Sequence, residues 1–124
     1  MQKIISYITF LFYSTNHHGI HSPFVFDLIT KCFHKKNNTL ESAAFKSYKR
    51  SLLNNHNVIE VTDFGAGSKI FKSNTREVSR VAKHAGIQTK RANLLIKITA
   101  YLKPNTILEF GTSLGMGTAA LHIG

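Results

Sequence analysis

Two glycine-containing segments hold the residues of this sequence whose types and spacing suit ligand chemistry. Each has an acidic residue two positions before its first glycine, after a run rich in apolar and β-branched residues: VIEVTDFGAGS at 58–68 and TILEFGTSLGMGT at 106–118. Glycine leaves the backbone open to close approach by a phosphate or carboxylate, and the amides at the start of a following helix can donate to that anion. Both segments are therefore candidates for the binding loop of a nucleotide-like cofactor.

The residues that follow each loop favour the second segment. A mostly apolar run over 119–123 follows it at once, as expected for a helix lying on a sheet, whereas 69–73 contains no helix start. We therefore predict a strand over 106–110, then a cofactor loop, then a helix. A tight turn without a ligand is the alternative, because a single glycine pattern has low specificity. In the first loop a structural turn is preferred to contact of Asp63 and Ser68 with a substrate.

Several motifs, taken in order, resemble those of class I S-adenosylmethionine-dependent methyltransferases. ILEFGTSLG (107–115) resembles their first motif in the E-x-G-T/A-x-x-G form of small-molecule O-methyltransferases, and KRANLLIKITAYLKPN (90–105) resembles the helix that precedes that strand. HGIHSPFVFDLITK (18–31) and VTDFGAGSK (61–69) resemble the N-terminal region of a bacterial methyltransferase-like family. The resemblance covers roughly residues 15–121.

The resemblance implies an α/β, Rossmann-like methyltransferase fold, present here only as a helical N-terminal region, the first strand and the cofactor loop. It implies S-adenosylmethionine as cofactor and assigns no metal ligand and no catalytic residue. Five residues would surround the methionine part of the cofactor: Glu109, Gly111, Thr112, Ser113 and Gly115. The carboxylate would favour the amino group, directly or through water, and the loop amides would meet the carboxylate of the ligand.

The length of the sequence after the loop shapes the functional expectation. A Rossmann-like fold binds the ribose with an acid about 20 residues beyond its glycine loop, and only fifteen residues follow Glu109. We therefore expect a helical extension or cap over 1–104 and the start of a truncated cofactor-binding domain over 105–124. The full-length protein would transfer a methyl group to a small-molecule acceptor, and this chain would be an inactive N-terminal part. Apolar surface meant for the remaining sheet would be exposed, which predicts self-association.

The charge of the chain supports a different function as the alternative. Sixteen Lys and Arg against six Asp and Glu give a net charge of +10. Such an excess attracts nucleic acid or other anionic partners. The basic residues are scattered, however, and no block reaches five like charges. The alternative prediction is therefore a small basic helical module that binds nucleic acid or another anionic partner. Methyl transfer is the preferred prediction.

The remaining elements are predicted from periodicity and capping residues. Helices are expected over 3–14, 23–34, 40–54, 75–85 and 90–102, and a short strand over 58–62. Ser22 can cap the second helix, with Pro23 at its first position, and Thr39 can cap the third. Asn74 and Glu77 have the spacing of a capping box for the fourth helix.

The cysteine and histidine content argues against a metal site. Cys32 is the only cysteine, which excludes an internal disulfide and is compatible with a cytoplasmic protein. The candidate ligands near it lack regular spacing: His17, His18, His21 and His34. We predict no metal and expect loop or capping histidines, with a lid over the cofactor pocket as a further hypothesis for residues 18–24.

The apolar run over 4–13 is too short to span a bilayer, which takes about 20 apolar residues. No small-residue cleavage site follows it, so we expect a buried or amphipathic first helix, with a secretory signal as the alternative.

Overall fold

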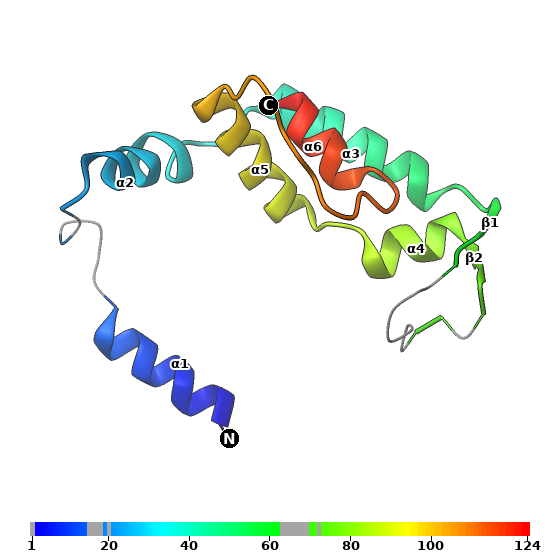
Figure 1. Ribbon diagram of the computed structural model, residues 1–124, viewed down its shortest axis with the longest axis horizontal. Helices are drawn as coiled ribbons and strands as arrows, with labels where there is room; N and C mark the ends of the chain where they lie inside the picture. Colours follow the sequence, from blue (N-terminus) through cyan, green and yellow to red (C-terminus); the bar gives the residue numbers. More distant parts are fainter. Residues whose placement is uncertain (1, 15–18, 20, 63–69, 72) are drawn as a thin grey trace. The chain divides into compact units, whose positions relative to one another are not determined.

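The computed structural model divides into two compact units, Met1–Lys35 and Lys36–Gly124. It describes residues 2–14, 19, 21–62, 70–71 and 73–124 (Figure 1). The predicted functional boundary at residue 104 lies inside the second unit and stays a prediction.

The first unit is helical. Helix α1 spans Gln2–Tyr13, and α2 (Pro23–Asp27) continues into the π-helical segment η2 (Leu28–Phe33). Ser22 Oγ accepts a hydrogen bond from the Val25 amide (3.5 Å), with Pro23 at the first helical position. The predicted cap and helix are thus confirmed, except that the last six residues are π-helical and the helix ends at Phe33.

Helices α3, α5 and α6 form the centre of the second unit. Their bounds are Thr39–Leu53, Thr89–Leu102 and Met116–Ile123, and α4 (Val78–Ala85) packs against α3. The three lie side by side in Figure 1, with α6 in contact with both α3 and α5. The buried cluster between these three helices and α4 consists of Phe45, Ala82, Ala92, Ile96, Met116 and Ala120. The small alanines on three helices let the backbones approach, and Phe45 fills the remaining space.

The caps of α3 and α5 follow local chemistry. Asn38, not the predicted Thr39, caps α3: its Oδ1 accepts from the Leu40 amide (3.0 Å) and its Nδ2 donates to Glu41 (2.7 Å). Helix α5 ends where Lys103 adopts a left-handed conformation (φ 46°) before Pro104, which cannot continue a helix.

The β structure is a small antiparallel ribbon of β1 (Val58–Glu60) and β2 (Thr75–Glu77). The predicted helix over 75–85 is therefore wrong for its first three residues, and the Asn74–Glu77 capping box does not form. The ribbon takes up their backbone groups, and the amide of Val78 donates to the Asn57 carbonyl (3.0 Å). Helix α4 begins only after this pairing ends.

The predicted strand over 106–110 is also wrong in this structure, because these residues have no regular secondary structure. A strand needs a hydrogen-bonded neighbour, and the sheet found in the described part of the chain is the β1–β2 ribbon alone. The apolar side chains of this segment are exposed, to 77% for Leu108 and 90% for Phe110. The Rossmann-like fold and the self-association stay predictions.

Candidate functional site

The loop before α6 has the backbone of a ligand loop. Gly111, Ser113 and Gly115 have positive φ angles of 79°, 49° and 70°, with residues of negative φ between them. Alternation of this kind turns successive N–H groups towards one side and creates a concavity that accepts an anion. A serine in this conformation is strained, and such strain clusters at ligand-binding sites.

The carboxylate of Glu109 lies at the start of α6. Its Oε2 accepts a hydrogen bond from Thr118 Oγ1 (2.6 Å), and its Oε1 lies so close to Gly117 that a Cβ there would overlap it. A negative charge is favourable at this end of a helix because of the helix dipole. The carboxylate and the first turn of α6 therefore form one polar corner.

Three amide donors of this corner are open. The N–H groups of Met116, Gly117 and Thr118 donate to no residue that the structure describes. The first turn of any helix leaves such donors, and they bind carboxylates and phosphates. The corner thus offers one acceptor group and several donors within one turn of helix.

A cavity of about 200 Å³ lies against this corner. Four of the five predicted cofactor residues line it, namely Glu109, Gly111, Thr112 and Ser113. The opposite wall comes from the end of α4, from the turn that follows it and from α5: Ala85, Gly86, Ile87 and Leu95. Gly115 is not part of the lining and instead forms the N-cap of α6.

Tyr48 of α3 supports the loop before α6 through a hydrogen bond. The Tyr48 Oη donates a hydrogen bond to the Leu114 carbonyl (2.8 Å), and a Cβ on Gly115 would lie 3.3 Å from the Tyr48 Oη. No signal in the sequence links Tyr48 to a loop 66 residues later. Gly117 was not predicted as a site residue, although it lies in the glycine segment 106–118.

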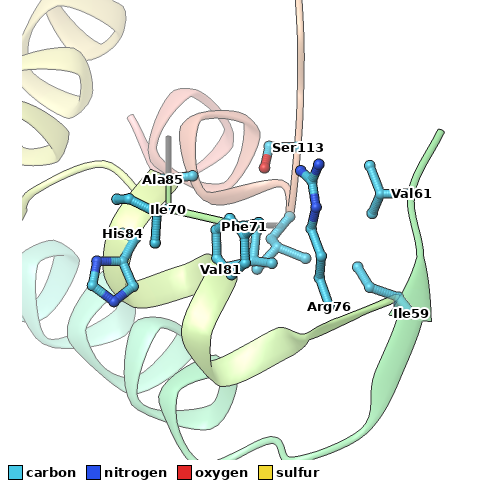
Figure 2. Close-up of a pocket in the computed structure, with 10 residues that line it drawn as sticks. Ile59, Val61, Ile70, Phe71, Arg76, Val81, His84, Ala85 and Ser113 are labelled. Carbon is cyan, nitrogen blue, oxygen red and sulfur yellow. The ribbon is translucent and has the colours of Figure 1, made fainter. Parts of the chain in front are cut away.

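A second cavity, of about 320 Å³, opens beside the first (Figure 2). Ala85, Ser113 and Leu114 line both cavities. On its other side stands the ring of Phe71, with the Arg76 guanidinium carbon 5.2 Å from the ring centroid and the His84 ring edge-on at 6.2 Å. The loop therefore separates a polar cavity from a larger, mostly apolar one.

A polar cluster next to the ribbon involves Glu77. Its Oε1 accepts a hydrogen bond from Ser79 Oγ (2.5 Å) and lies 2.5 Å from His56 Nδ1. Ser79 and then His56 hold the pKa of the Glu77 carboxyl below its ordinary value. Both partners contact the same carboxylate, so Ser79 is not activated by His56 as a nucleophile, and the cluster holds the ribbon to α4.

The Glu77 cluster predicts a pH effect of definite sign. A depressed carboxyl pKa stabilises the fold above the pKa of the unfolded chain, and this contribution is lost as the pH falls through the lower, folded value. An NMR titration should show Glu77 titrating below its ordinary range, and Ser79→Ala should raise that pKa. Ser73→Ala is the control, because the Ser73 hydroxyl donates to the Thr75 carbonyl instead. An unchanged Glu77 pKa in Ser79→Ala would contradict the assignment.

The histidine and acidic loops are only partly described. His17, His18, Asp63 and Ser68 lie outside the described residues, so the lid and substrate-contact hypotheses stay untested. His21 is exposed and Cys32 is buried. Within the described segments, no group of three or more His, Cys, Asp or Glu side chains could hold a metal ion, and no helix is long and apolar enough to cross a bilayer.

Comparison with known proteins adds no family assignment. No family model, curated protein or solved structure matches the chain. The motif and the geometry of the loop are therefore the observations that bear on the function of the chain.

Proposed function

We propose that the loop before α6 binds the amino-acid part of S-adenosylmethionine, and that the chain belongs to a methyltransferase acting on a small molecule. The observation that carries the proposal is that the Glu109 carboxylate lines one small cavity together with Met116 and Gly117, whose amides donate to no described residue. An α-amino acid is a zwitterion, and this corner offers an acceptor for its ammonium group and donors for its carboxylate. The motif resemblance adds the identity of the ligand.

The size of the cavity supports the amino-acid half rather than the whole cofactor. Sites for complete drug-sized ligands enclose about 300–1,000 Å³, whereas this cavity measures about 200 Å³. The methionine part would occupy it and the nucleoside would extend beyond it. The cofactor supplies the methyl group, and the contribution of these residues is to fix its position and orientation, which lowers the entropic cost of transfer.

A pair of ligands that differ only in the amino-acid part tests the proposal. Calorimetric titration should show S-adenosylhomocysteine binding at least about tenfold more tightly than 5′-methylthioadenosine, which keeps the nucleoside but lacks the amino acid. About tenfold corresponds to 1.4 kcal/mol, the order of a single charge-assisted hydrogen bond. Equal affinities would overturn the proposal.

Substitution of Glu109 tests whether its carboxylate causes the difference in affinity between the two ligands. Glu109→Gln should remove most of the difference between the two ligands, because the amide lacks the charge that attracts the ammonium group. Glu41→Gln is the matched control: Glu41 also lies in the first turn of a helix, α3, where it accepts from Asn38 (2.7 Å). A chain that binds neither ligand but binds duplex DNA with a steep salt dependence would favour the nucleic-acid alternative instead.

A further inference from the structure

The second cavity has the composition of a small-molecule site. Its walls are mainly apolar, formed by Ile59 and Val61 at the ribbon, by Phe71, by Val81 of α4 and by Leu114 of the loop. At about 320 Å³ it reaches the lower end of the range for ligand pockets, which are mostly apolar with a few placed polar groups. It is thus larger and less polar than the cavity assigned to the amino-acid group.

One strongly basic side chain lines this cavity. Arg76 projects from β2 among the lining residues in Figure 2, and its guanidinium carbon lies 5.2 Å from the centroid of the Phe71 ring. Its Nε donates to the Ser73 carbonyl (3.4 Å), so the side chain is held from both sides. A guanidinium presents a planar fork of N–H donors that matches a carboxylate.

The ionisable side chains among the described lining residues are basic or neutral. None of the described lining residues is acidic, and His84 is the other ionisable side chain among them. An apolar molecule about the size of one aromatic ring would contact the apolar walls of the cavity. An anionic group on that molecule would bind the guanidinium of Arg76.

We infer that this cavity binds a small carboxylate with an apolar, ring-sized body, its carboxylate on Arg76 and its body against the wall formed by Ile59, Val61 and Leu114. Ser113 and Leu114 border both cavities, so such a ligand lies next to the group bound at the loop. Naming this ligand the methyl acceptor rests on the proposed function, whereas its binding does not require the cofactor.

Three probes of graded chemistry test the inference without the cofactor. Benzoate carries both ring and charge, benzamide has the same shape without the charge, and acetate has the charge without the ring. In ¹H–¹⁵N spectra, benzoate should shift the amides of Val81, Ser113 and Leu114 and bind about tenfold more tightly than benzamide, a ratio typical of one charge-assisted contact. Acetate should cause no comparable shift at equal concentration. Equal binding of benzoate and benzamide, or shifts elsewhere only, would overturn the inference.

Two arginines, Arg76 and Arg80, have guanidinium groups over the Phe71 ring and provide the matched variants. Arg76→Gln should lower benzoate affinity about tenfold and leave benzamide affinity unchanged, and Arg76→Lys should lower benzoate affinity by less, because the charge remains. Arg80→Gln is the control: Arg80 also lies over Phe71, at 5.7 Å, but does not line the cavity. Equal benzoate affinity in Arg76→Gln and Arg80→Gln would overturn the inference.

The two proposals fail separately in this design. Loss of S-adenosylhomocysteine binding with benzoate binding intact would remove the proposed function and keep the carboxylate site. Binding of S-adenosylhomocysteine with no benzoate shifts at the cavity would do the reverse.

Discussion

Replacing Phe45 with alanine is expected to lower the free energy of unfolding of the second unit by about 3–5 kcal/mol, the usual cost of removing a buried Phe side chain. Phe45 is fully buried at the centre of the cluster that joins α3 to α4, α5 and α6. Its small neighbours Ala82, Ala92 and Ala120 cannot expand to fill the cavity that the substitution would leave. Folded domains have about 5–15 kcal/mol of stability in total, so the loss is a large part of it.

The measurement must report on the second unit alone. Urea titration followed through the amide signals of Ala92 and Ile96 meets this need, because both residues lie in the buried face of α5. Leu40→Ala is the matched control: Leu40 is in the same helix but 79% exposed, and its truncation should change stability by no more than about 0.5 kcal/mol. Similar losses for Phe45→Ala and Leu40→Ala would show that the helices do not pack as described.

The helices could be predicted because their signals are local. Apolar spacing in α3 and α5 and the Ser22–Pro23 start of α2 depend on residues within a few turns of one another, and the observed bounds agree within one or two residues. The cap of α3 is Asn38 and not the predicted Thr39, an error of one position between two residue types that both cap helices, of which Asn is the more favourable.

The errors occur where pairing between distant residues decides the structure. Residues 75–77 have helix-start chemistry, but they pair with Val58–Glu60, a contact that no local pattern records. Residues 106–110 have strand composition, yet a strand exists only with a neighbour to accept and donate its hydrogen bonds. The pairing with β1 therefore decides the structure of residues 75–77, and the lack of a strand neighbour among the described residues decides that of residues 106–110.

In the candidate site, too, residues that are close in sequence could be predicted, whereas residues brought together by tertiary packing could not. The loop motif placed Glu109, Gly111, Thr112 and Ser113 together because they are adjacent in sequence, and they line one cavity. The hydrogen bond from Tyr48 and the second cavity could not be predicted, because both depend on the tertiary packing of α3, β2 and α4 against the loop. Arg76 and Phe71 had no motif of their own, and the cavity alone makes them candidates.

Replacing Gly117 with alanine is expected to weaken S-adenosylhomocysteine binding by about ten- to a hundredfold while leaving the fold intact. A Cβ at this position would overlap the carboxylate of Glu109, which is the far end of a flexible side chain and can swing away. The substitution therefore displaces the charge proposed to bind the ligand, at a cost of about 1.5–3 kcal/mol for a hydrogen bond to a charged group. The hydrogen bond from Thr118 is lost with it, but alanine favours the helix, so stability should change by less than about 1 kcal/mol.

A double-mutant cycle separates this mechanism from a general disturbance of the loop. If Gly117→Ala acts by moving the carboxylate, it should have little further effect on affinity in the Glu109→Gln protein, whose side chain has already lost the charge. Isothermal titration of the four proteins with S-adenosylhomocysteine, together with their unfolding curves, gives the coupling energy. Thr118→Val adds a graded case: it removes the hydroxyl that donates to Glu109 without placing an atom against the carboxylate, and should cost less affinity than Gly117→Ala. Additive losses from Gly117→Ala and Glu109→Gln would mean that the glycine serves the ligand or the backbone directly, and that the Glu109 carboxylate at the start of α6 is not the group that the alanine displaces.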